Sequence, residues 1–166
     1  KNEDLRYNTL YFYDLNAKLN YTMNPFNRFY ISSYIGKDRF AAGGSSWGNS
    51  LLSARWNHLF SDKAFANLTL TGSWYNHSFD GYSPENSMFR LTLLLRNYNL
   101  SYDLTRYTRS NNKINLGLNA RYTALPPTRL DGNIEGIPIL IDSSRSCVQL
   151  LTTLYAEGIF DLTAKL

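Results

Sequence analysis

The sequence has no apolar run approaching the roughly 18 residues that a membrane-spanning helix needs. Its longest candidate, residues 91–95, is short and is broken by Thr92. A helical membrane protein is therefore excluded. The chain also has one cysteine, Cys147, so it cannot form an internal disulfide. We expect a lone thiol in a loop, with no second cysteine or nearby histidine to share a metal, and we predict neither a metal nor a cofactor.

Clustered charge and catalytic motifs are also missing. The formal net charge is +4, but the Lys and Arg residues are scattered along the chain. A nucleic-acid partner is therefore not expected, because such proteins gather basic residues into a patch. There is no Gly-x-Ser-x-Gly motif, and the two histidines, His58 and His77, are predicted at opposite strand ends. We predict no catalytic residues and no enzyme activity.

Aromatic residues make up 15% of the chain and charged residues only 18%, which indicates a packed structure and not a disordered tail. The sequence starts without an initiator methionine and shows no signal-peptide pattern. We expect residues 1–166 to be a partial domain of a longer protein.

Alternation of apolar and polar residues is the dominant pattern. In residues 13–23, one set is Tyr13, Leu15, Ala17, Leu19, Tyr21 and Met23, and the residues between them are polar. Because successive side chains of a strand point to opposite faces, this pattern predicts a strand with one apolar and one polar face. The pattern returns in six further segments, which makes seven predicted strands: 29–35, 51–60, 65–79, 96–106, 113–121 and 149–160.

The predicted connections alternate between short and long. Residues 24–27, 61–64 and 108–112 are short and rich in turn-forming residues, whereas 37–48, 80–87 and 124–147 are long. In a meander, every second connection lies at the same end of the sheet. All five prolines are predicted to lie outside the strands, since proline cannot donate to a ladder. Outer-membrane barrels show the same asymmetry, with short periplasmic turns and long outer loops.

Alternation alone would also suit a soluble β-sandwich, which remains an alternative. Three features favour a membrane barrel: aromatic residues toward the ends of the apolar face, a polar face rich in Asn, Thr and Ser, and long strands. Strands can cross a bilayer only as a closed sheet. The predicted fold is therefore all-β: an antiparallel, up-and-down transmembrane β-barrel segment, with about seven strands of a larger barrel.

Three stretches resemble a known family: Trp47-Gly48-Asn49 leading to residues 55–60, then residues 66–79, and residues 154–163. They are similar to the barrel of TonB-dependent outer-membrane receptors, particularly those of Bacteroidetes-type bacteria. The resemblance implies a barrel of about 22 strands with a plugged lumen. It also implies location in the bacterial outer membrane, contact with its lipid, import of a scarce solute such as an iron chelate or an oligosaccharide, and energy from the TonB complex through an N-terminal region that is missing here. A passive, porin-like barrel is the alternative transport function.

In this interpretation the candidate solute contacts lie in the long loops or face the lumen. The loop candidates are Arg39, Trp47, Tyr82 and Arg129, and the lumen-facing candidates are Arg55 and Arg121.

Overall fold

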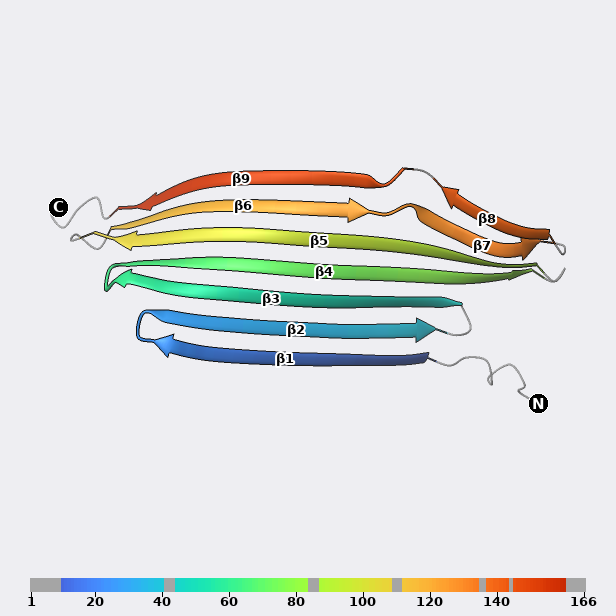
Figure 1. Ribbon diagram of the computed structural model, residues 1–166, viewed down its shortest axis with the longest axis horizontal. Coiled ribbons are helices and arrows are strands. Elements are labelled where there is room, and N and C mark those ends of the chain that lie inside the picture. Colours follow the sequence, from blue (N-terminus) through green and yellow to red (C-terminus); the bar gives the residue numbers. More distant parts are fainter. Residues whose placement is uncertain are drawn as a thin grey trace, which may run out of the picture.

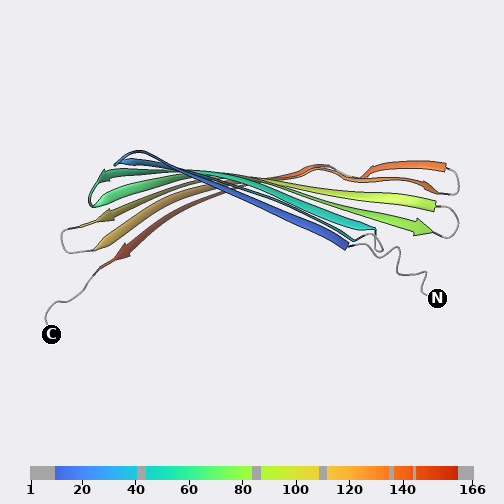
Figure 2. The same ribbon diagram turned by 90° about the horizontal axis from the view of Figure 1, so that it is seen from below.

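The computed structural model describes residues 10–40, 44–83, 87–108, 112–134, 137–143 and 145–160. These residues form nine strands in a single antiparallel sheet (Figure 1): β1 (Leu10–Asn24), β2 (Asn27–Phe40), β3 (Ser45–Ser61), β4 (Ala64–Ser83), β5 (Ser87–Tyr107), β6 (Lys113–Leu125), β7 (Thr128–Ile134), β8 (Ile137–Ser143) and β9 (Cys147–Ile159). Figure 2 shows the sheet from its edge as one twisted layer. Among the described residues, no helix is long and apolar enough to cross a membrane.

All seven predicted strands are present. Two further strands, β7 and β8, lie between the last two of them in the sequence. Beyond Pro126 and Pro127, β7 continues from β6 and pairs with residues 88–92 of β5, whereas β6 pairs with residues 96–107. β8 then returns beside β7 and leads into β9 (Figure 1). The prediction that residues 124–147 form a loop is therefore wrong, because this region contains the β7–β8 hairpin.

The break at Pro126 and Pro127 shifts the pairing by one residue. Arg96 lies opposite Ala124, so an unbroken ladder would place Thr92 opposite Thr128, but Thr92 lies opposite Arg129. One extra residue in a strand is a β-bulge. Because side chains alternate with a period of two, even-numbered residues of β6 share a face with odd-numbered residues of β7.

The prediction that every proline lies outside the strands is wrong for Pro138, which lies in β8 opposite Asn133. β8 pairs only with β7, so it is an edge strand. Proline is tolerated there because one side of an edge strand needs no ladder hydrogen bond.

Short turns lie at one end of the sheet, as predicted, and this end is called the turn end (Figure 1). In the β1–β2 turn, the Asn24 side-chain oxygen accepts hydrogen bonds from the Phe26 backbone N–H (3.0 Å) and from the Asn27 side-chain amide (2.9 Å). In the β3–β4 turn, the Ser61 hydroxyl accepts one from the Lys63 backbone N–H (3.3 Å). These side chains satisfy turn N–H groups that the ladder leaves free.

At the opposite end, called the loop end, the strands extend farther than predicted. β2 continues to Phe40 and β3 begins at Ser45, inside the predicted 37–48 connection. β4 has 20 residues and β5 has 21, about twice the 9–11 that a tilted strand needs to cross a bilayer. The 37–48 and 80–87 connections were thus predicted too long, because strand pairing continues where the apolar pattern changes.

The sheet has almost no core of its own. Among the described residues, the one buried hydrophobic side chain is Ala66, which is 3% exposed. Leu15 is 63% and Leu154 is 76% exposed, as expected for a single layer and not for a sandwich. One whole face of apolar side chains is left for an environment outside this chain.

Candidate functional site

The apolar face is defined by a row of side chains that the register places side by side across six strands. Each is paired directly with the next, and directly paired residues of neighbouring strands share a face. The row consists of Leu19, Ile31, Ala54, Leu70, Leu100 and Ala120. An apolar band therefore crosses β1 to β6 in the middle of the sheet, and the next member of the row, on β9, is Thr152.

Two aromatic clusters lie on either side of this band. Toward the turn end, Phe29 stacks on Trp56 with 6.3 Å between ring centroids, and the chain of rings continues through His58 to Phe60. Toward the loop end, the rings of Trp74, Tyr98 and Tyr122 adjoin one another, with centroids 5.9 Å and 6.3 Å apart. An apolar band between two aromatic girdles is the outer surface typical of a membrane barrel.

The opposite, polar face is held together by hydrogen bonds between side chains of neighbouring strands. The Ser53 and Thr71 hydroxyls lie 3.3 Å apart. The Asn119 amide donates to the Ser101 hydroxyl over 2.7 Å, and the Thr123 hydroxyl donates to the Asn97 side-chain oxygen over 2.8 Å. Such groups are stable beside water but are costly in hydrocarbon, so this face suits a hydrated interior.

Within the described residues, the cations on the polar face form no ion pair. The register places Lys18, Arg28, Arg55 and Arg121 on this face. In the described part of the chain, the ion pairs are Arg90 with Asp80 and Arg129 with Asp131, both elsewhere. Carboxylates on the polar face instead accept hydrogen bonds from neutral groups, as Asp14 does from Tyr34 and Asp103 from Tyr155, each over 2.6 Å.

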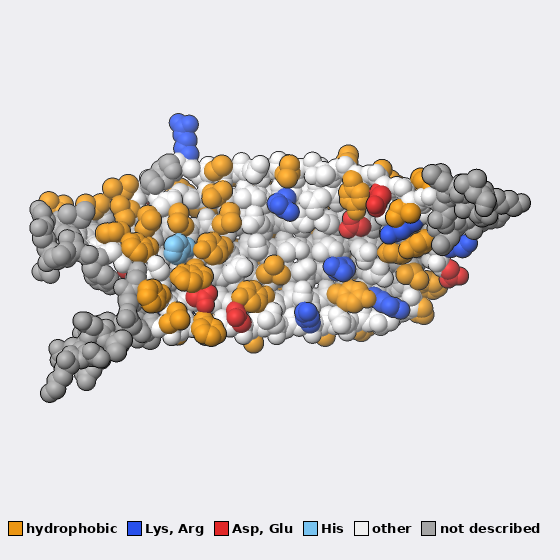
Figure 3. Space-filling view, turned by 180° about the vertical axis from the view of Figure 1, so that it is seen from behind, with side chains coloured by type: hydrophobic (Ala, Val, Ile, Leu, Met, Phe, Trp, Pro, Cys, Tyr) orange, Lys and Arg blue, Asp and Glu red, His pale blue; other side chains and the backbone are white. Residues whose placement is uncertain are grey.

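At the loop end the two faces exchange character. On the side that continues the apolar face, the Ser46 and Ser78 hydroxyls lie 2.7 Å apart. On the side that continues the polar face, Trp47 packs edge to face against His77, with centroids 6.3 Å apart, and Phe79 pairs with Leu91. Figure 3 shows this second side, with a centre of polar side chains and apolar side chains gathered around the histidine toward one end.

The best-defined charged contact at the loop end joins Asp80 and Arg90, which lie opposite each other on β4 and β5. The guanidinium donates from Nε to Asp80 Oδ1 over 2.6 Å and from Nη2 to Oδ2 over 3.1 Å. This bidentate contact lowers the pKa of the Asp80 carboxyl, and the charge of Arg39 acts in the same direction. The Asp80 carboxyl is therefore ionised near neutral pH.

The structure places the predicted contact residues on two different surfaces. Trp47, Arg55 and Arg121 belong to the polar side of the sheet. Arg39 and Arg129 lie on the side that continues the apolar face, where Arg129 donates a hydrogen bond to Asp131. The backbone of Tyr82 pairs with Met88 in β4 and β5.

The loop assignments of Arg39, Trp47, Tyr82, Arg129 and Cys147 are wrong. All five are strand residues, because pairing continues into the regions predicted to be long connections, and Cys147 is the first residue of β9. Lys18 and Arg28 were missed as candidates. Their places in the alternation, on the same face as Arg55, could have identified them.

Within the described ranges, no three His, Cys, Asp or Glu side chains gather closely enough to hold a metal ion. The two histidines lie at opposite ends of the sheet, as predicted. His58 contacts the Asn27 side-chain oxygen (2.8 Å) near the turn end, and His77 lies near the loop end.

No protein-family model matches the chain, and no curated protein matches its sequence. Among solved structures, the chain is similar to the ferric yersiniabactin uptake receptor FyuA from Yersinia pestis, with a TM-score of 0.58 and 15% sequence identity. The similarity covers 87% of this chain and 25% of the receptor chain, so the chain spans about a quarter of that receptor's length. This likeness shows the fold: an antiparallel up-and-down sheet similar to part of the barrel of such a receptor.

Proposed function

We propose that the chain forms part of the barrel wall of a TonB-dependent receptor in the bacterial outer membrane, which imports a scarce solute such as an iron chelate or an oligosaccharide. The observation that carries the proposal is the division of one layer into an apolar face bordered by aromatic clusters and a polar face whose cations form no ion pair with the residues that the structure describes. The fold similarity to a ferric yersiniabactin uptake receptor supports it.

The apolar face would meet lipid. Leu70 and Leu100 lie in the middle of the band and are 54% and 37% exposed, so the described residues leave a large part of each side chain uncovered. Each large apolar side chain taken out of water contributes about 1.5–3 kcal/mol. A bilayer supplies that burial without a second protein layer. The exchange of polarity at the loop end then marks the height at which the strands leave the hydrocarbon.

The polar face would line the lumen. We propose that Arg55 and Arg121 contact anionic groups of the solute in the lumen, and that Trp47 contacts the solute nearer the loop end. The outward positions of Arg39 and Arg129 make them poor candidates for a lumen contact. Carboxylate or catecholate groups of an iron chelate are the chemistry that arginine recognises well. The TonB complex would supply energy through another part of the protein.

The test is uptake by cells that produce the full-length protein. A panel of radiolabelled ferric chelates and oligosaccharides is offered to these cells with and without an intact TonB system. We expect one class of solute to accumulate only when TonB is present, and Arg55→Gln with Arg121→Gln to reduce that accumulation if the solute is anionic. Uptake of small solutes of many kinds without TonB would instead establish a porin-like barrel.

A further inference from the structure

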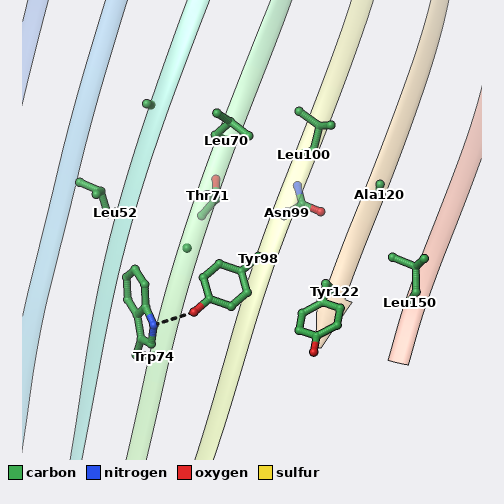
Figure 4. A pocket seen from close by; sticks show the side chains of 12 residues that line it. Leu52, Leu70, Thr71, Trp74, Tyr98, Asn99, Leu100, Ala120, Tyr122 and Leu150 are labelled. Carbon is green, nitrogen blue, oxygen red and sulfur yellow. Dashed lines mark hydrogen bonds between the residues drawn. The ribbon is translucent and has the colours of Figure 1, made fainter. Parts of the chain in front are cut away.

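The outward face carries an open hollow at the loop-side aromatic cluster. It has a volume of about 540 Å³, and its walls come from β3 to β6 and β9 (Figure 4). Ala54, Gly72 and Ala120 leave the space, because their side chains are small or absent, and larger residues surround it: Leu52, Leu70, Trp74, Tyr98, Leu100, Tyr122 and Leu150. In Figure 4, Thr71 and Asn99 lie behind the sheet, on the other face. The hollow is therefore lined almost entirely by hydrocarbon and aromatic rings.

A second hollow of about 300 Å³ adjoins the first on the loop side, and Trp74 lines both. Its lining on the outward face is mixed: Gly48, Ser50 and Asn76 are small or polar, whereas Tyr13, Ile35 and Leu94 are aromatic or apolar. Lys37 and Arg96 also line it, on β2 and β5. The apolar hollow is thus followed, past an indole ring, by a second hollow of mixed lining that carries two cations.

These two cations are available to bind an anion. Both are exposed on the outward side of the sheet. Neither makes an ion pair within the described residues, whereas Arg90 and Arg129, farther toward the loop end, are paired with Asp80 and Asp131. Arginine binds phosphate oxygens through its fork of N–H groups, and lysine binds them as a point charge.

We propose that this surface binds one anionic membrane lipid, with its phosphate in the second hollow between Lys37 and Arg96 and an acyl chain in the apolar hollow beyond Trp74. Lys37 lies two residues beyond Trp74 toward the loop end, and Arg96 lies directly opposite Trp74, whose ring leans the other way toward Tyr98 and the apolar hollow. The two cations, the indole ring and the apolar hollow therefore follow the order of headgroup, interface and acyl chain in a lipid. The proposal rests on the membrane location proposed above, since it places the loop-side aromatic cluster at an interface.

The test uses the full-length protein in non-ionic detergent micelles. Native mass spectrometry counts bound lipid as phosphatidylglycerol, or phosphatidylcholine with the same acyl chains, is added. Lys37→Gln with Arg96→Gln removes the two outward cations. Arg55→Gln with Arg121→Gln is the matched control, since it removes two cations from the opposite face of the same sheet. Heat-dependent migration on gels confirms that each variant is folded.

We expect the wild type and the control pair to prefer phosphatidylglycerol, and the outward pair to bind it about 25-fold more weakly, at roughly fivefold per cation. Ala54→Leu with Ala120→Leu fills the apolar hollow and should weaken the binding of both lipids. Equal binding of the two lipids by the wild type, an equal loss in the control pair, or competition by millimolar inorganic phosphate would overturn the proposal.

Failure of the membrane location has a different signature. If the protein stays folded and monomeric without detergent, before any lipid is added, the barrel proposal itself is wrong. If the protein needs detergent but shows no headgroup preference, only the proposed lipid site is wrong.

Discussion

Trp74 and Tyr98 are joined across β4 and β5 by a hydrogen bond and by their rings. The indole Nε1–H donates to the tyrosine hydroxyl over 3.3 Å, and the rings meet edge to face with centroids 5.9 Å apart. The contact is diagonal, because Gly72 and not Trp74 lies directly opposite Tyr98. The missing side chain of Gly72 lets the indole lie over the backbone toward Tyr98.

Trp74→Phe should destabilise the folded protein by at least about 0.5–1.5 kcal/mol, because the hydrogen bond is lost and a smaller phenyl ring replaces the indole. Tyr98→Phe should have a similar effect, and the double variant should cost less than the sum of the two. Urea unfolding of the full-length protein in vesicles measures these free energies. Tyr122→Phe, which alters a hydroxyl outside this bond, is the control. Full additivity would show that the two residues do not interact.

Leu70→Arg and Thr71→Arg test which face meets lipid, because the two residues are adjacent in β4 but lie on opposite faces. Arginine at the midplane of a lipid-facing surface costs about 2–4 kcal/mol. We therefore expect Leu70→Arg to lower the free energy of unfolding in vesicles by this amount, and Thr71→Arg to change it by less than about 1 kcal/mol. The reverse order would place the polar face against lipid.

Gly117→Ala should be costly because a ring occupies the space beside this glycine. Tyr155 lies directly opposite on β9, a Cβ at position 117 would collide with its ring, and its hydroxyl donates to Asp103 over 2.6 Å. Displacing the ring should cost about 1–3 kcal/mol. Tyr155→Phe, which loses only the hydrogen bond, separates the two effects.

Gly48→Ala is the matched control for that substitution, since its Cβ would meet chiefly the end of the flexible Asn76 side chain. We expect a smaller loss of stability, measured by the same unfolding experiment. Equal losses at the two glycines would mean that the Tyr155 ring can move aside freely.

The pairing of Asp80 with Arg90 should make the loop end sensitive to acid. The Arg90 hydrogen bonds lower the carboxyl pKa from its ordinary value of 3.8, so the folded state binds this proton less readily than the unfolded state. The stabilisation is full above the unfolded-state pKa and is lost as the pH falls through the lower, native pKa. Asp80→Asn should therefore cost less than about 1 kcal/mol at pH 7 and nothing at strongly acidic pH.

Unfolding of wild type and Asp80→Asn across this pH range measures the effect. Asp38→Asn, which removes a carboxylate outside the two ion pairs, is the control. A difference between wild type and Asp80→Asn that stays constant down to acidic pH would contradict the prediction.

Deleting Pro127 alone should be tolerated, because it removes the extra residue of the bulge and leaves Arg129 opposite Thr92. Deleting both Pro126 and Pro127 would shift β7 by one residue and turn Leu130 away from Leu91, its present partner. In urea unfolding, we expect the single deletion to lower the free energy of unfolding by less than about 1 kcal/mol, and the double deletion to lower it by several times more. Equal effects would show that β7 can change its register freely.

The middle of the sheet could be predicted from the sequence because apolar and polar residues keep their faces there. At the loop end alternation continues with the faces exchanged, as when Trp74 gives way to Ser78 on one side while Phe79 appears on the other. A pattern search that assumes one apolar face treats this as the end of the strand. For the same reason β7 and β8 were not predicted. The one-residue shift at the prolines also interrupts the alternation between β6 and β7.

The candidate site was predictable only in part. The alternation correctly places Arg55 and Arg121 on the polar face. The approach of Lys37 and Arg96 to one hollow could not be predicted, because it depends on the register of four neighbouring strands. Register between strands depends on pairing across the sheet and on the turns, which local patterns do not specify.

The interruption at Pro126 and Pro127 divides the sheet into two parts that can open separately. The ladder of β5 with β6 ends at Arg96 and that with β7 begins at Thr92, so no continuous line of hydrogen bonds ties the β7–β8 hairpin to the β6–β9 pair along that edge. Amide protons of the hairpin should therefore exchange with deuterium much faster than those of the central strands. The β7–β8 hairpin can then open and close while the pairing of β6 with β9 stays intact.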